Sequence, residues 1–234
     1  MARVAPESRF EDLIDAATKV FIENGYLRTQ MSDVAEAMGV AKGTVYLYVE
    51  SKEALFDLAC RLADAPRPLV RPAVTPVPTP APGATVEYIS GRLAQSPVLP
   101  LMRSLVEKKK RGDARIELEM FVRELYDDLA RNRRSLKLVD RSARDLPDLA
   151  AIWFDSTRAG LVGLLAAYLE DRIAKGKLRR VPNTAAAARV VIETAVFWAV
   201  HRHWDAHPQQ IDESAAKETV VHFTVGALTK GSDR

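Results

Sequence analysis

The sequence predicts an all-α protein with an N-terminal helix-turn-helix head and a C-terminal helical domain. Apolar residues recur three and four positions apart in both halves of the chain, which is the helical period, and no glycine spacing indicates a parallel sheet. Seven of the 13 prolines fall between Pro66 and Pro82, where each removes a backbone donor and stops a helix. We therefore expect a head over residues 1–65, a proline-rich linker over 66–84 and a helical domain over 85–234.

Composition places the chain among ordinary globular proteins. It has 234 residues, 47% hydrophobic and 28% charged, which suits one or two domains of about 150 residues each. The single cysteine, Cys60, cannot form an internal disulfide. We find no signal peptide and no uncharged apolar run of about 18 residues, so we expect a cytoplasmic protein without a membrane span. The formal net charge of +3 is too small to indicate a nucleic-acid partner without a motif.

The head begins with two helices of unequal length. Ser8 and Glu11 have capping-box spacing at the start of the first, and Gly25 ends it. A second, short helix is expected over residues 30–38, with Thr29 as its N-cap and Gly39 as its stop. The first helix carries a continuous apolar face and serves as core scaffold.

Two more helices follow closely. One is expected over residues 42–48, and another starts after Ser51 and carries apolar residues at helical spacing. Because the link at Gly39 and Val40 is so short, the second and third helices must cross steeply. This arrangement is a helix-turn-helix.

The proline-rich segment separates these helices from the rest. Its proline alternation between Val74 and Pro82 favours extended polyproline II structure, which acts as a semi-rigid spacer. We take residues 66–84 as the domain boundary.

The remaining residues are predicted to form two small helices followed by four long ones. Two small ones are expected within residues 85–111, interrupted at Pro97 and Pro100. Four long helices are expected over 113–134, 147–174, 183–206 and 211–230. The helix over 183–206 is apolar around most of its circumference, so it must be covered on more than one side, either within the domain or by a second subunit.

Four short motifs begin within residues 29–53: Asp-Val-Ala at 33–35, Gly-Val at 39–40, Lys-Gly-Thr-Val-Tyr at 42–46 and Ser-Lys-Glu-Ala-Leu at 51–55. Together they resemble the DNA-binding motif of TetR-family transcriptional regulators. It is strong over residues 8–64 and extends further only in helical architecture and order. Two positions depart from the family pattern: Ala41 replaces a common serine, and Val49 replaces a usual phenylalanine, which loosens a packing contact.

The motif has the chemistry that groove binding needs. Lys42 can reach guanine or a phosphate, Gly43 permits close backbone approach, and Thr44 can meet a thymine methyl or a phosphate. The resemblance adds positions that contact the DNA backbone, and a phosphate can be capped at the start of the second helix. The expected DNA-binding residues are Thr29, Gln30, Lys42, Gly43, Thr44, Tyr46, Tyr48 and Lys52.

The charge of the head limits how it can bind DNA. Residues 1–65 contain seven basic and eleven acidic residues. This balance argues against non-specific coating of nucleic acid and makes binding depend on a local face, with help from Arg3 and Arg9 ahead of the first helix.

One short recognition helix reads only a few base pairs, so a homodimer on an inverted repeat is expected. The family resemblance places the dimer interface on the last two helices, and the candidate interface residues are Phe197, Trp198, His201, Trp204, Val220 and Phe223. The C-terminal domain would also enclose a pocket for an apolar or aromatic effector that releases a repressor from its operator. The candidate pocket residues are Phe121, Trp153, Phe154 and Tyr168.

Two alternatives stay open. A structural DNA-binding dimer would have no effector, and a small metal-dependent enzyme would carry the head as a helical appendage. Only His201, His203 and His207 hint at metal chemistry, and we assign them to a polar interface or surface, expecting no metal, cofactor or catalytic residue. The basic run over 108–111 and the arginines near 131–134 are expected to be solvated helix ends. The sequence does not specify the effector, the operator, the regulated genes or the sign of regulation.

Overall fold

The computed structural model describes residues 8–107 and 112–230, and within them the regular structure is helical. The chain forms two compact units. Unit 1 contains residues 1–92 and 134–153, and unit 2 contains residues 93–133 and 154–234. Each unit is therefore built from two separate stretches of sequence. The all-α prediction is confirmed.

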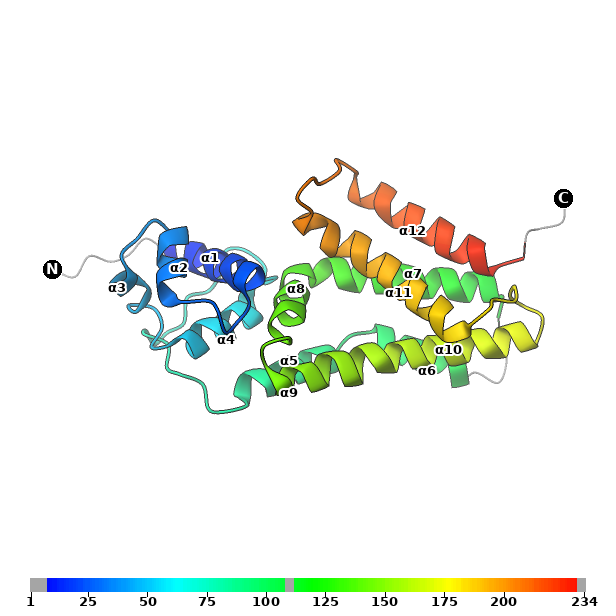
Figure 1. The fold of residues 1–234 in the computed structure, drawn as a ribbon, viewed down its shortest axis with the longest axis horizontal. Helices are drawn as coiled ribbons and strands as arrows, with labels where there is room; N and C mark the ends of the chain where they lie inside the picture. The colour runs from blue at the N-terminus through cyan, green and yellow to red at the C-terminus, as the bar shows by residue number, and fades with distance from the viewer. Residues whose placement is uncertain (1–7, 108–111, 231–234) are drawn as a thin grey trace. The chain divides into compact units, whose positions relative to one another are not determined.

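Unit 1 holds the helix-turn-helix. Its helices are α1 (Ser8–Asn24), α2 (Met31–Ala37), α3 (Lys42–Val45), α4 (Lys52–Leu62), most of α5 (Ala84–Ala94), α8 (Arg133–Ser142) from its second residue, and α9 (Pro147–Ala150). Figure 1 shows the first four in blue to cyan, with the short α3 following α2.

An aromatic cluster joins the first helix to the fourth. The ring of Phe56 on α4 meets Phe21 on α1 edge to face, with centroids 5.1 Å apart, and Tyr26 contacts both. Such ring pairs stabilise by about 0.5–1.5 kcal/mol beyond the burial of their area. Because α1 and α4 are fixed in this way, the short helices between them have a rigid support.

Two local expectations about the short helices are wrong. The N-cap of α2 is Gln30 and not Thr29. The Thr29 hydroxyl donates instead to the Gly25 carbonyl at 2.7 Å, and Asp33 accepts from the Gln30 N–H at 2.8 Å. The recognition helix is also shorter than expected, since α3 ends at Val45 and residues 46–48 form a turn.

The segment expected to act as a linker lies along unit 1. We call residues 66–83 the strap. Its Val77 forms an isolated parallel bridge with Val49, directly after α3. Val77 N–H donates to the Tyr48 carbonyl at 2.7 Å, and Glu50 N–H donates back to the Val77 carbonyl at 3.0 Å. The strap is thus held by backbone hydrogen bonds to the helix-turn-helix.

Helix α8 is absent from the sequence-based assignment. Within unit 1, Asp64 just beyond α4 accepts hydrogen bonds from the backbone N–H groups of Arg134 and Ser135, at 3.0 and 2.8 Å. An acidic side chain at the first turn complements the helix dipole. The corner after α8 closes on Gly25, where a Cβ atom would lie 2.5 Å from Asp145 Oδ2 and where φ is +83°. Only glycine suits this position.

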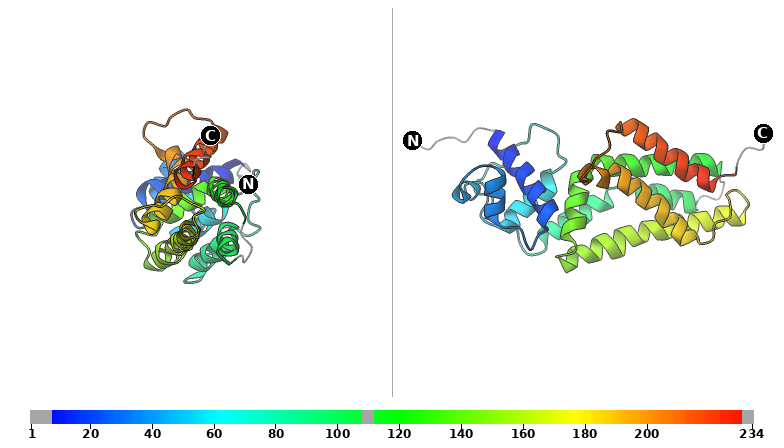
Figure 2. Two further views of the ribbon diagram at one scale, coloured as in Figure 1. Left: turned by 90° about the vertical axis from the view of Figure 1, so that its right-hand side faces the viewer. Right: turned by 45° about the horizontal axis from the view of Figure 1, so that its top comes forward.

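Unit 2 is a packed set of longer helices. They are α6 (Val98–Glu107), α7 (Ala114–Arg131), α10 (Ala159–Ala174), α11 (Thr184–Ala199), the 3-10 turn η2 (His201–Trp204) and α12 (Glu213–Leu228). Asp113, Asn183 and Asp212 cap α7, α11 and α12 through their side chains. Helix α7 packs against both α11 and α12, while α10 packs against α6 and α11 (Figures 1 and 2).

A buried ion pair ties three of these helices together. Arg172 on α10 is 1% exposed and donates from Nε and Nη2 to Glu117 Oε2 on α7, at 3.0 and 2.7 Å. Tyr168 also donates to that oxygen, and Arg172 reaches the carbonyl of Leu105 on α6. Because the carboxylate and the guanidinium are both hydrogen-bonded, the charges can remain buried.

The expected helix over residues 147–174 is present, with a π-helical stretch, η1 (Ala151–Arg158), between α9 and α10. Within the described residues it is also the one helix long and apolar enough to cross a membrane by length and composition. Core helices of water-soluble proteins pass the same test. Helix α11 ends at Ala199, earlier than expected, and η2 continues it.

Candidate nucleic-acid interface

The start of α3 presents the residues expected to read DNA. Lys42 and Gly43 are exposed, Thr44 is half-buried, and Val45 turns inward and is fully buried. Apart from its chain neighbours and the backbone of its own helix, no described residue has a heavy atom within 4 Å of a Cβ built at Gly43, so another molecule could approach the backbone closely there. Lys42, Gly43 and Thr44 are therefore brought together on one surface.

The two residues after Val45 are also at the surface. Tyr46 is 40% exposed and Leu47 is 65% exposed. Sequence reasoning included Tyr46 and did not include Leu47, whose exposure follows from the turn that replaces the last part of the expected helix. An exposed leucine beside a recognition helix offers an apolar contact for a thymine methyl group.

Three of the expected DNA-binding residues lie differently. Thr29 and Tyr48 are each 2% exposed, so neither side chain reaches the surface in this structure. The amine of Lys52 lies 3.1 Å from the Tyr26 carbonyl and 4.6 Å from the centre of the Tyr26 ring. These side chains support the head from within. Gln30, in contrast, is exposed at the start of α2.

Tyr26 and Glu53 fix the start of α4. The Tyr26 hydroxyl donates to Glu53 Oε1 at 3.0 Å. Burial and the adjacent carboxylate raise the pKa of Tyr26, and the backbone hydrogen bond together with the Tyr26 and Ser51 contacts lowers the pKa of Glu53. The phenol stays protonated and the carboxylate ionised at neutral pH, so this contact holds the α1–α4 corner in place.

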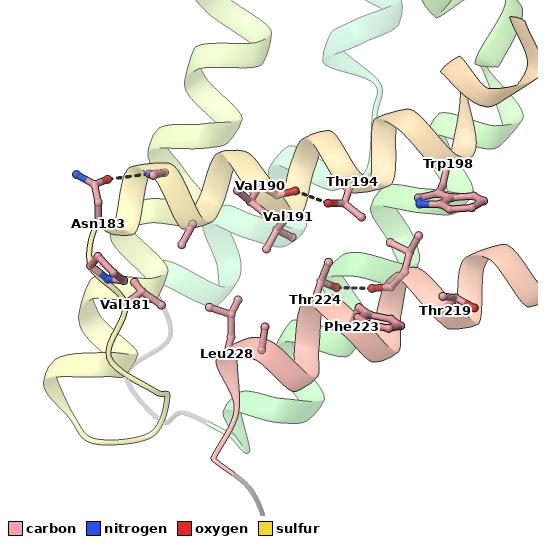
Figure 3. Close-up of a pocket in the computed structure, with 15 residues that line it drawn as sticks. Val181, Asn183, Val190, Val191, Thr194, Trp198, Thr219, Phe223, Thr224 and Leu228 are labelled. Atoms are coloured by element: carbon pink, nitrogen blue, oxygen red, sulfur yellow. Dashed lines mark hydrogen bonds between the residues drawn. The ribbon is translucent and has the colours of Figure 1, made fainter. Parts of the chain in front are cut away.

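An apolar groove runs between α11 and α12 in unit 2. It has a volume of about 670 Å³ and is walled by side chains from both helices, with Val181 to Asn183 at one end. In Figure 3, Trp198 and Phe223 project between the two helices, and Val190 lies on the α11 wall. Val190 is 64% exposed and Phe223 is 70% exposed. This is a large apolar surface for a helix pair to leave open.

Half of the expected interface residues line this groove, and the others lie outside its lining. Trp198, Val220 and Phe223 line it, and Phe197 is 44% exposed beside it. His201 and Trp204 lie in η2, beyond the end of α11, and are half-buried.

The expected effector residues do not line the groove. Phe121 and Tyr168 are at most 1% exposed in the core of unit 2. Trp153 belongs to unit 1, where its indole N–H donates to Asp140 at 3.0 Å, and Phe154 begins the second stretch of unit 2. Aromatic residues at helical spacing here mark packing, and sequence spacing alone does not separate a core from a cavity.

The histidines lie in a polar cluster. His203 Nε2 contacts an Arg133 nitrogen at 2.6 Å and lies 3.5 Å from Glu213. Burial and the neighbouring arginines lower the pKa of His203. Within the described residues, no group of three or more histidine, cysteine or acidic side chains is arranged to hold a metal ion.

Comparison with known proteins bears on the head. Residues 13–59 match the family described as "Bacterial regulatory proteins, tetR family". The matched residues span α2 and α3 together with most of α1 and α4. Over 45 residues the chain is 49% identical to the fatty acid metabolism regulator protein of Bacillus subtilis (strain 168). This alignment covers 19% of this chain and 23% of that protein. The curated relatives are thus matched over only about a quarter of their length.

Solved structures resemble the chain along most of its length. The ketosteroid transcriptional regulator KstR2 of Mycobacterium tuberculosis has a TM-score of 0.57 at 16% identity, with 95% of this chain and 96% of that chain covered. A tetR-family regulatory protein from Rhodococcus RHA1 has a TM-score of 0.55 at 17% identity, with 98% and 100% covered. These likenesses establish the fold of the C-terminal helices.

Proposed function

We propose that the chain is a DNA-binding transcriptional regulator that acts in the cytoplasm as a homodimer on an inverted-repeat operator. The observation that carries this proposal is the surface at the start of α3, where Lys42 and Gly43 are exposed and the half-buried Thr44 lies beside them. The match of residues 13–59 to a family of regulatory proteins supports the same reading.

We assign the exposed residues of the head to DNA contact and the buried ones to support of α3. Lys42 and Thr44 face base edges, with Gly43 allowing α3 to approach. Tyr46 and Gln30, both exposed, contact the DNA backbone and set the register. Thr29, Tyr48 and Lys52 hold the recognition segment in place from below, because their polar atoms or rings are buried or already bound to protein.

The groove between α11 and α12 is proposed as the dimer face, occupied by a second copy of the chain. It lies on the helix that is apolar around most of its circumference, and Val190, Phe197 and Phe223 expose apolar area along it. Two copies would cover each other's exposed rings, and a twofold axis would present two heads to the two halves of an inverted repeat.

We further propose repression that is relieved by an apolar or aromatic small molecule bound in unit 2. Phe121 and Tyr168 are packed, so a ligand that touches them must first displace their neighbours. An effector works only if it binds the two states of the dimer with different affinity. If an apolar compound releases bound DNA, the proposed effector response is supported. If no such compound changes DNA binding, the protein is the structural DNA-binding dimer without an effector.

Selection of bound duplexes from a random pool tests the DNA-binding proposal. We expect an inverted repeat whose half-sites are centred one helical turn, about 34–36 Å, or a multiple of it apart. Recovery of no preferred sequence by the folded chain would contradict the proposal.

Sedimentation tests the dimer face. Phe223→Glu places a charge on the exposed apolar wall and should convert the dimer to a monomer at micromolar concentration. Ser214→Glu changes another exposed residue, in the first turn of the same helix, and is the control that should leave the dimer intact. A Phe223→Glu chain that still sediments as a dimer would refute the assignment, and loss of a bound small molecule in place of dissociation would identify the groove as a ligand site.

A further inference from the structure

The strap lies beside the recognition segment, which is α3 with the turn over residues 46–48, and prolines alternate with other residues where the two meet. Prolines at 76, 78 and 80 leave N–H groups only on Val77 and Thr79 between them. Both N–H groups donate to the head: Val77 to the Tyr48 carbonyl at 2.7 Å and Thr79 to Glu50 Oε2 at 3.0 Å. In Figure 1 the strap, in cyan to teal, passes the connection between α3 and α4. The proline alternation therefore docks the strap beside the DNA-reading surface.

The other end of the strap is fixed on α1. Arg67 forms ion pairs with Glu11 at 3.5 Å and Asp15 at 2.6 Å, and Leu69 N–H donates to Glu11 Oε1 at 2.6 Å. The charge of Arg67 is neutralised by these two carboxylates. The span between Leu69 and Thr75 is thus suspended between two attachment points.

Arg71 lies in that span. Its guanidinium stacks over the ring of Tyr48, 5.1 Å from the centroid, and its Nη2 donates to Thr75 Oγ1 at 3.3 Å. The side chain is exposed, and no carboxylate lies within ion-pair distance of it among the described residues. The ring stack orients the cation without neutralising it.

Tyr48 is expected to contact the DNA backbone, but its side chain is buried and Arg71 lies over its ring. Packing buries Tyr48 to 2% exposure, and its hydroxyl has no hydrogen-bond partner in the described part of the chain. Position 48 is one that the family resemblance assigns to backbone contact. Here the Arg71 guanidinium lies over the Tyr48 ring, while the Lys52 amine is bound to protein carbonyls.

We propose that Arg71 is a DNA phosphate contact, so that the strap is a second DNA-binding element beside the helix-turn-helix. This inference rests on the proposed function. The strap carries Arg67 and Arg71 and no acidic residue, whereas residues 1–65 carry four more acidic than basic residues. A guanidinium held rigidly next to the recognition segment supplies local positive charge that α3, with Lys42 alone, lacks.

The salt dependence of DNA binding tests the proposal. The probe is the duplex that the wild-type chain selects from a random pool. Arg71→Met keeps a long side chain over Tyr48 and removes the charge, while Arg71→Lys keeps the charge. Each phosphate contact contributes about 0.9 to the slope of log K against log salt, so two heads losing one contact each should lower the slope by about 1.8 and the affinity at 0.1 M roughly 60-fold.

A matched control separates a local contact from a change in net charge. Lys19→Met removes one charge from the exposed side of α1, where Lys19 is 69% exposed and pairs with Glu23, and should leave the slope unchanged. Arg71→Lys should restore most of the slope. A wild-type slope and affinity in Arg71→Met would overturn the strap contact and leave the proposed function standing. A wild-type chain that selects no duplex would overturn both.

Discussion

The buried pair between Glu117 and Arg172 gives a stability prediction that the structure fixes closely. Arg172→Met leaves the Glu117 carboxylate, 6% exposed, with two hydrogen-bond donors among the described residues: the Tyr168 hydroxyl at 2.9 Å and the Gly112 N–H at 3.2 Å. Removing one partner of a buried ion pair costs about 3–5 kcal/mol, because the other charge stays in a low dielectric. We expect this loss in the free energy of unfolding of unit 2.

The double variant Glu117→Met/Arg172→Met should recover much of that loss. It removes both charges and leaves apolar side chains of similar length. The remaining cost is the Tyr168 hydroxyl, whose other contact is the Ala114 carbonyl at 3.4 Å. A poorly satisfied buried hydroxyl costs about 1–3 kcal/mol, so the double variant should be more stable than Arg172→Met by about 2 kcal/mol.

Urea unfolding followed by circular dichroism measures these differences. Protein concentration is held constant, because dimerisation contributes to apparent stability, and the m-values are compared to show that the unfolding transition is the same. A double variant as unstable as Arg172→Met, or more so, would refute the reasoning, because the loss would then come from packing and not from an unpaired charge.

Three further outcomes are expected. Lys42→Ala should lower DNA affinity and relax base preference at one position of each half-site, whereas Tyr46→Ala should weaken all sequences equally; identical specificity profiles from repeated selection would contradict these roles. The Tyr126 hydroxyl and the Arg133 and Arg202 guanidinium groups outweigh burial and lower the pKa of Glu213. The stabilising contribution of Glu213 is therefore present above the ordinary glutamate pKa of 4.5 and is lost as pH falls through the lower pKa of the folded state. In Glu213→Gln the free energy of unfolding should fall less steeply at acid pH, and an unchanged acid dependence would count against this assignment. Burial raises the pKa of the Cys60 thiol, so Ellman's reagent should label it only after unfolding, and rapid labelling of the folded chain would show that α4 opens.

Local signals in the sequence predict several helix starts. Ser51, Asp113 and Asn183 lie at or just before expected helix starts, and each caps its helix in the structure because a short polar side chain can satisfy free N–H groups in the first turn. Gly25 ends α1 with a positive φ for the reason that the sequence suggests. These features depend on a few neighbouring residues, so they can be read without the fold.

Contacts between distant segments could not be read in this way. Tyr48 is buried under a residue 23 positions later, so its exposure depends on the path of the strap. The sequence does not predict the arginine-rich α8, whose first turn is capped by Asp64, an acidic residue about 70 positions earlier in the chain. Phe121 and Tyr168 lie at helical spacing, which fits the wall of a pocket and a packed core equally well. Their burial in the folded unit shows that they belong to the core.

The basic run over residues 108–111, expected to be a solvated helix end, lies outside the described residues, as does Arg3. Arg131, near the second cluster, forms ion pairs with Glu124 and Asp128 at 3.3 and 3.4 Å. Arg133 and Arg134 are likewise paired with acidic groups, Glu213 and Asp15 respectively. These arginines are therefore committed to contacts within their own units.

The central claim is that two copies of the exposed α3 surface bind duplex DNA together. A hydroxyl-radical footprint of the chain on its selected duplex tests this most directly. We predict two equivalent protected patches related by the symmetry of the inverted repeat, both lost together in Lys42→Ala at a concentration where the wild type saturates the site. A single patch, or protection that survives this substitution undiminished, would contradict it.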